Sequence, residues 1–437
     1  MRRRCGERIA AAAMCGGFAL AALAAAPGEN PHPVRLSLPA VRPLSAMARL
    51  GRRLFYDPSL SASGRQSCAS CHDPSNAYGP PNALPAQYGG PALDRQGLRP
   101  PPSLEYLERQ PGFSIGPDNE ENENVNLQRL AAQAAGLARP DKQAGRAPAA
   151  PAMVPQGGFF WDGRADTLQA QAYGPLLNPA EMANPSADAV AHKLDHAQYR
   201  NGFERLFGAR VYDHPKLLVA EATFALARYQ FEDPSFHPYD SKFDAWLEGR
   251  ARLDARELRG YRLFNDPRKG NCAACHLDAP SPNGLPPLFT DHQYEALAVP
   301  RNPEIAANRD PRFHDLGVCG PLRTDMAAQT RYCGMFLTPT LRNAARRKVF
   351  FHNGVYRSLA RVLAFYDFRA AAPWRVYPRD RAGRLLRYDD LPRRYWGNVD
   401  TSDAPFDRKP GTPPPLSARD MRDLVAFLET LNDGWKP

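Results

Sequence analysis

The sequence has no long apolar run after its first 26 residues, and this absence argues against membrane-spanning helices in the rest of the chain. No later stretch approaches the roughly 20 apolar residues that a span needs. A basic stripe of the kind that binds nucleic acid is also missing, although the formal net charge is +10. The basic residues gather between Arg342 and Arg394, which indicates a solvated face, with a docking patch for an acidic redox partner as the alternative. We expect neither a membrane span in the mature chain nor a nucleic-acid partner.

Convincing sheet patterns are lacking as well. Apolar residues instead recur at helical spacing, over the ranges 45–56, 127–137, 217–229, 239–249, 254–264, 358–366 and 417–431. Prolines number 45, about twice the ordinary usage of ~5%, and they lie in long loops rather than in one block. The sequence therefore predicts a mainly α protein with long loops.

The first 26 residues have the pattern of an export signal. Four arginines within residues 2–8 precede an apolar run, 9–23, and three alanines follow at 24–26. A retained N-terminal anchor is one alternative, and a lipoprotein at Cys15 is disfavoured by the residues that precede it. We expect a cleaved signal peptide, 1–26, and a mature protein in the periplasm.

Cysteine is scarce outside two short motifs in which two cysteines, three positions apart, are followed directly by histidine. This is the attachment signature of a c-type haem, whose vinyl groups bind the two thiols while the histidine becomes the proximal iron ligand. The motif residues are Cys68, Cys71 and His72 in the first motif and Cys272, Cys275 and His276 in the second. A single match could be a zinc or thiol-redox site, but two matches in an exported chain predict two covalently bound haem c groups.

Two cysteines remain beyond the signal region and the motifs. Cys319 and Cys333 form an even pair in an oxidising compartment, so we expect a disulfide. Closing a loop of this length would stabilise the fold by on the order of 3 kcal/mol.

An internal repeat precedes the two motifs. Residues 51–58 (GRRLFYDP) and 260–267 (GYRLFNDP) are close copies, and each stands just before its own attachment motif. Such duplication predicts two related cytochrome c-like haem domains, 27–240 and 241–437.

With these motifs the chain resembles the bacterial dihaem cytochrome c peroxidases, a superfamily that includes the MauG-like enzymes of methylamine utilisation. The matching stretches occur in family order across residues 45–370, at 54–58, 67–72, 160–164, 171–176, 178–182, 272–276, 338–343, 352–354 and 365–366. The resemblance implies a peroxidatic N-terminal domain and an electron-transfer C-terminal domain.

Histidine is absent between His72 and His192. Members of this superfamily that need reductive activation carry a second histidine after the first motif, so we expect the first iron to have an open position. The resemblance places Glu181 and Gln171 beside it, where a carboxyl group can move a proton between the peroxide oxygens. The alternative for Glu181 is a charge at a helix start. His352 is a further catalytic candidate, with a structural histidine as the alternative.

For the second haem the resemblance points to Tyr366 as the ligand opposite His276, at a position where the peroxidases carry methionine. An anionic tyrosine oxygen stabilises higher oxidation states of iron, whereas methionine raises the reduction potential. Met335 and Met326 are competing ligands, and Tyr366 would then be a core aromatic. Trp161 is the family's aromatic residue between the haems, as a relay for electrons or as packing.

Family members also hold a calcium ion between the domains through an asparagine side chain and backbone carbonyls. The asparagine position corresponds to Pro100, which offers no side-chain ligand, and the carbonyls would fall near Arg347 and Val349. The sequence does not support calcium binding by these residues.

Three functions are consistent with these features. The first is reduction of hydrogen peroxide to water with electrons from a small cytochrome c or cupredoxin. The second is a MauG-like oxidation of residues in a partner protein, which the missing histidine and Tyr366 favour. The third is a dihaem electron carrier without enzymatic activity, which requires two six-coordinate low-spin haems.

Overall fold

Short helices joined by long loops make up most of the chain. The computed structural model describes residues 27–118, 153–195 and 197–437, so the predicted signal peptide and the predicted helix at 127–137 lie outside the described residues. The α-helices are α1 (Ala46–Phe55), α2 (Cys68–Cys71), α4 (Leu168–Leu177), α5 (Ala187–Leu194), α6 (Ala197–Phe207), α7 (Pro215–Glu232), α8 (Lys242–Leu247), α9 (Ala255–Phe264), α10 (Leu359–Phe368) and α11 (Ala418–Glu429).

Strands occur only as three small antiparallel pairs in the described part of the chain. They are β1 (Tyr88–Gly89) with β2 (Arg95–Gln96), β3 (Ser114–Pro117) with β4 (Met153–Gln156), and β5 (Tyr294–Glu295) with β6 (Phe336–Leu337). The prediction of a mainly α protein is confirmed. No helix among the described residues is long and apolar enough to cross a membrane.

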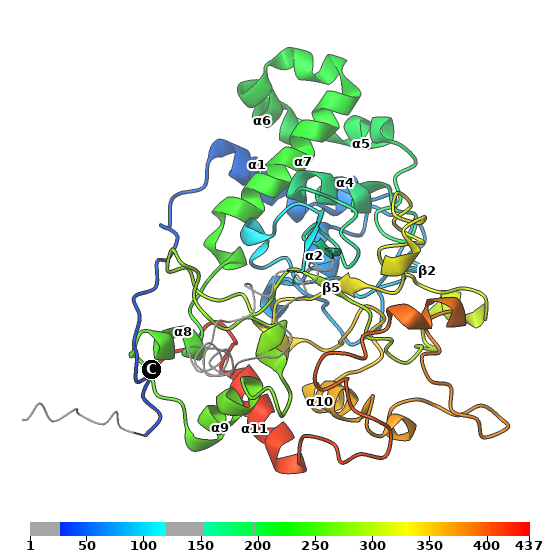
Figure 1. Ribbon diagram of the computed structural model, residues 1–437. Coiled ribbons are helices and arrows are strands. Elements are labelled where there is room, and N and C mark those ends of the chain that lie inside the picture. Colours follow the sequence, from blue (N-terminus) through cyan, green and yellow to red (C-terminus); the bar gives the residue numbers. More distant parts are fainter. Residues whose placement is uncertain (1–26, 119–152, 196) are drawn as a thin grey trace, which may run out of the picture.

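Two large hydrophobic clusters divide the helices. The first is built on α1 and α4 to α7, and the second on α8 to α11. Figure 1 shows these two groups of helices at opposite ends of the molecule, with the loops between them. We refer to them as the first and second modules; the domain limits 27–240 and 241–437 stay a prediction.

The opening segment departs from that division. Although residues 28–37 precede α1, they run along the second module (Figure 1). The Val34 amide donates to the Leu247 carbonyl at 2.9 Å, and Leu36 belongs to the second cluster. This segment therefore ties the N-terminal part of the chain to the C-terminal module.

Each module contains a pair of closely crossing helices, and the internal repeat provides the contact. A Cβ atom at Gly51 on α1 would stand 1.9 Å from the Ala225 carbonyl oxygen on α7. At the equivalent repeat position, a Cβ atom at Gly260 on α9 would stand 2.0 Å from the Asp423 carbonyl oxygen on α11. Only glycine allows such close approach of two backbones. The last described helix, α11, therefore packs on α9, the helix that precedes the second attachment motif.

The helix boundaries follow from their capping residues. Ser45 accepts a hydrogen bond from the Ala48 amide at the start of α1, and Ser417 caps α11 in the same way through the Asp420 amide. Cys319 and Cys333 form the predicted disulfide, which closes a loop of the second module.

A buried polar network joins the modules. The Asn343 side-chain amide donates to Glu105 Oε2 at 2.6 Å and also to Asp433, to which the Tyr106 hydroxyl donates as well. The Arg342 guanidinium lies nearby and pairs with Asp244 at 2.6 Å. The network holds the loop before β3 against the C-terminal end of the chain.

Candidate functional site

The first attachment motif lines a cavity in the first module. Cys68 and Cys71 bound the short helix α2, and His72 follows it. The Nδ1 atom of His72 lies 3.1 Å from the Tyr78 carbonyl oxygen, so Nδ1 carries the proton and Nε2 is left as the ligand atom. Burial lowers the pKa of His72 to about 4, which keeps the imidazole neutral and able to bind iron at neutral pH.

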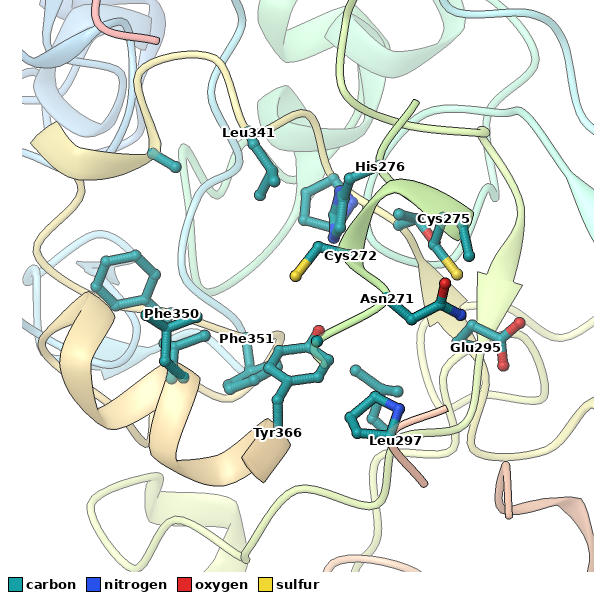
Figure 2. A pocket seen from close by; sticks show the side chains of 18 of the residues that line it. Asn271, Cys272, Cys275, His276, Glu295, Leu297, Leu341, Phe350, Phe351 and Tyr366 are labelled. Carbon is teal, nitrogen blue, oxygen red and sulfur yellow. The ribbon is translucent and has the colours of Figure 1, made fainter. Parts of the chain in front are cut away.

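The second motif repeats this arrangement in a cavity of the second module. Cys272 begins a short 3₁₀ helix, η7 (Cys272–Ala274), and the Nδ1 atom of His276 lies 2.8 Å from the Phe289 carbonyl oxygen. Burial lowers the pKa of His276 to about 4. In Figure 2, Cys272 and His276 lie on one side of this cavity.

The residues of both cavities fit a haem c. Apart from the disulfide, the free thiols of the described chain are those of the two motifs. Each cavity therefore offers two thiols for thioether bonds, a neutral imidazole with a free Nε2, and a largely apolar lining.

Glu181 and Gln171 line the first cavity, as expected. Gln171 projects from α4, and Glu181 lies in the turn that follows this helix. The Asn178 side chain donates to Glu181 Oε1 at 2.6 Å. Burial raises the pKa of Glu181, while the charge of Arg164 and the bond from Asn178 oppose the rise. A buried carboxyl group of this kind can accept and return a proton.

The backbone of Glu181 is held by a tight contact that the sequence analysis missed. The Gly90 amide donates to the Glu181 carbonyl at 2.8 Å. A Cβ atom at Gly89 would come within 2.6 Å of that same carbonyl oxygen. The Gly89-Gly90 pair could have indicated a close backbone approach from the sequence alone. Asn178 and Arg164 lie within stretches that match the family, 178–182 and 160–164.

Trp161 lies between the two cavities and lines both of them. Its indole N–H donates to the Pro100 carbonyl at 2.9 Å. The neighbouring Asp162 is fully buried and pairs with Arg99 at 2.8 Å, and Arg99 also pairs with Asp315 of the second module. This ion-pair chain fixes the segment that carries the tryptophan. A third, smaller cavity at the junction is also lined by Trp161, and we call it the junction cavity.

Tyr366 reaches the second cavity from α10. Figure 2 shows its hydroxyl group directed into the cavity from the side opposite His276. Its ring stacks on Phe406 with a centroid distance of 5.5 Å. The competing residues Met326 and Met335 pack instead against a separate cluster around Tyr294 and do not line this cavity.

His352 lies elsewhere than expected. It lines the second cavity and is not among the described residues that line the first, where Glu181 lies. Its ring stacks on Phe336 at a centroid distance of 3.5 Å, and Nε2 lies 3.4 Å from Asp390 Oδ2. The motif order along the chain did not reveal which cavity the loop after β6 enters.

Pro100, one of the positions considered for calcium, has another contact. The Pro100 carbonyl accepts the hydrogen bond from Trp161, and the Arg347 side chain lies at the junction cavity. Within residues 27–118, 153–195 and 197–437, no cluster of three or more His, Cys, Asp or Glu side chains is placed to hold a metal ion.

The fold and the two cavities are those expected of a helical haem protein of the c type. A model of the di-haem cytochrome c peroxidase family matches residues 45–252. The chain is 34% identical over 323 residues to methylamine utilization protein MauG of Paracoccus denitrificans. This alignment covers 74% of each of the two chains. It is 31% identical over 342 residues to cytochrome c551 peroxidase of Nitrosomonas europaea, which covers 77% of this chain and 76% of the relative.

A solved structure agrees with these relatives. The diheme peroxidase BthA from Burkholderia thailandensis superposes with a TM-score of 0.76 at 37% identity, covering 90% of this chain and 88% of that chain. The chain belongs to the di-haem cytochrome c peroxidase family, and the resemblance inferred from its motifs is confirmed. It is a peroxidase-type oxidoreductase, so the electron-carrier hypothesis is not retained.

Proposed function

We propose that this protein reduces hydrogen peroxide to water with electrons from a small cytochrome c or cupredoxin. It would act in the periplasm after removal of residues 1–26, with one haem c covalently attached in each of two domains, 27–240 and 241–437. Bound at His72, haem iron would supply the site for peroxide binding and electron transfer. The overall reaction takes two electrons and two protons and yields two water molecules.

The observation that carries this proposal is the lining of the first cavity. Glu181 and Gln171 lie in it, and among the described residues that line it His72 is the single histidine. The lining thus offers an acid–base group but no second imidazole to occupy the face opposite His72. A peroxidase site needs both features.

Glu181 moves the proton in this scheme. Asn178 holds Oε1, so the carboxylate is oriented with Oε2 free to accept a proton from one peroxide oxygen and return it to the other. Gln171 can orient the same substrate through its side-chain amide. Glu181 is half-buried, which limits contact between the transferred proton and bulk water.

The second module serves electron transfer. Its cavity has His276 on one side and Tyr366 on the other, and these two residues would hold a haem there. Trp161 lines both cavities and provides an aromatic ring on the path between them. Electrons would enter at the second site and leave at the first.

Steady-state turnover of peroxide with reduced cytochrome c tests the proposal. Replacing Glu181 by glutamine should lower kcat/KM by roughly 10²- to 10⁴-fold, the range typical of a lost acid–base group. Glu221→Gln is the matched control, because burial also raises the pKa of this carboxyl group but Glu221 lines neither haem cavity. Equal activity of the two variants would exclude Glu181 as the acid–base group.

A second function is favoured by Tyr366 and by the similarity to MauG proteins. In this alternative the protein uses peroxide to oxidise residues of a partner protein. Negligible peroxide turnover with any reduced small cytochrome or cupredoxin, together with peroxide-dependent changes in both haem spectra, would favour it over the first.

A further inference from the structure

Arg347 brings a guanidinium group to the junction of the two modules. It follows the 3₁₀ helix η10 (Ala344–Arg346) and lines both the second cavity and the junction cavity. Its Nη2 atom lies 3.5 Å from the carbonyl oxygen of Pro101, a residue that lines the first cavity. One side chain of the second module therefore reaches the surroundings of both haem sites.

Two other arginines at the junction of the modules have carboxylate partners. Arg99 pairs with Asp162 and Asp315, and Arg342 pairs with Asp244. Arg347 is half-buried, no ion pair in the described part of the chain includes it, and burial lowers its pKa to about 10. Burying a cation without an anionic partner is costly. We therefore expect a group bound in the cavity to supply the anionic partner of Arg347.

The lining of the second cavity identifies the chemistry of that anion. Arg347 is the single arginine or lysine among the described residues that line it. The carboxyl-bearing side chains there are those of Glu295, Asp367, Asp400 and Asp403. A carboxylate entering this cavity would be repelled by the acidic residues and attracted to Arg347.

We propose that Arg347 pairs with a propionate carboxylate of the haem in the second cavity. This inference rests on haem binding at His276, as proposed above. Guanidinium and carboxylate groups match in a bidentate geometry, which orients as well as neutralises the carboxylate. Since Arg347 also contacts the Pro101 segment, the pair would fasten the second haem to the first module.

Arg347 is thus a positioning residue whose charge also acts on the iron. A nearby positive charge disfavours the oxidised form of the haem, which carries one more positive charge than the reduced form. Loss of Arg347 should therefore lower the midpoint potential of the second haem, an effect that a purely structural side chain would not have.

Spectroelectrochemical titration of the full-length holoprotein tests the proposal with three variants. Arg347→Met should shift the second haem to a lower midpoint potential and leave the first haem less affected. Arg347→Lys keeps the charge and should stay close to the wild type. Arg381→Met, a change at an exposed arginine of the same module, should shift neither haem. An unchanged potential in Arg347→Met, or equal shifts in the Lys and Met variants, would overturn the pairing.

A crystal structure of the wild-type holoprotein provides a test that needs no variant. We expect a guanidinium nitrogen of Arg347 within hydrogen-bond distance of a propionate oxygen, and a guanidinium directed away from both propionates would overturn the inference. Haem staining of the denatured protein distinguishes failure of the pairing from failure of the proposed function. A protein without haem attached at Cys272 and Cys275 would contradict the proposed function, and the pairing with it.

Discussion

The Glu181 carboxyl group shows how its surroundings prepare a single residue for proton transfer. Burial favours the protonated form, and Arg164 and Asn178 favour the ionised form. Together these effects raise the pKa of Glu181, but its carboxyl group can still ionise. A group in this state can both take and return a proton near its pKa.

The first prediction at this scale concerns the pH dependence of turnover. As a base, Glu181 must be ionised, so kcat/KM should fall as the pH drops through its raised pKa. Asn178→Ala removes a donor that favours the carboxylate, and the pKa should rise further. The acid limb of the kcat/KM profile should therefore move to higher pH.

Asn201→Ala, a change at an exposed position on α6, is the control and should leave the profile unchanged. An acid limb that stays in place in Asn178→Ala, or moves to lower pH, would contradict the assignment of the limb to Glu181.

The second prediction concerns the ligand at the second site. A methionine ligand raises the reduction potential of haem relative to an anionic tyrosine oxygen. Tyr366→Met should therefore raise the midpoint potential of the second haem and change its electron paramagnetic resonance signal. Tyr388→Phe removes a buried hydroxyl outside the cavity and serves as the control. If the signal of the second haem were identical in wild type and Tyr366→Met, Tyr366 would not be the ligand.

At the scale of elements, the crossing of α1 over α7 supports the first attachment motif. Leu50, Leu54 and Phe55 turn the apolar face of α1 into the core, and Gly51 lets the backbones touch. The same pattern on α9 and α11 supports the second motif. Each haem site is therefore placed by a helix pair whose separation a single glycine sets.

Gly51→Ala should destabilise the protein. The new methyl group would meet the backbone carbonyl of Ala225 at 1.9 Å, and a backbone atom cannot move aside as a flexible side chain can. We expect a loss of about 1–3 kcal/mol or more in the free energy of unfolding, as for other overpacked contacts. Gly397→Ala is the control, because a methyl group there meets open space. Equal denaturation midpoints for the two variants would show that the crossing can relax.

At the scale of the whole molecule, the junction depends on buried polar groups as well as on apolar packing. Glu105 of the first module contacts Asn343 of the second, and Asp433 lies close by. Burial, and next the charge of Asp433, raise the pKa of Glu105 to about 8. The carboxyl group is therefore protonated in the folded protein at neutral pH.

Stability should consequently depend on pH through this group. The ordinary pKa of Glu105 is 4.5, so between this value and about 8 the folded state holds a proton that the unfolded state has released. The resulting stabilisation is fully present below 4.5 and is lost as the pH rises through about 8. As the pH rises from about 5 to about 9, the wild type should lose about 1–3 kcal/mol more of its free energy of unfolding than Glu105→Gln loses.

Thermal unfolding of the holoprotein over this pH range measures the effect. Glu204→Gln changes an exposed ion pair with Arg200 and should follow the wild-type curve. Parallel curves for the wild type and Glu105→Gln would mean that Glu105 titrates normally in the folded protein.

Local chemistry explains what could be predicted from the sequence. Haem attachment needs two cysteines and a histidine within five consecutive residues, so both motifs are complete in the sequence. Helix starts at Ser45 and Ser417 follow from capping and apolar spacing, and Cys319 and Cys333 were the pair left for a disulfide. Each of these depends on residues that are close in sequence or on simple counting.

The tertiary structure decided the features that depend on packing between distant segments. It placed His352 in the second cavity, Trp161 between both cavities, and residues 28–37 along the second module. It also showed that Arg99 has carboxylate partners, whereas no described ion pair includes Arg347. Burial and the distance between charges set these properties, and both arise only when remote parts of the chain come together.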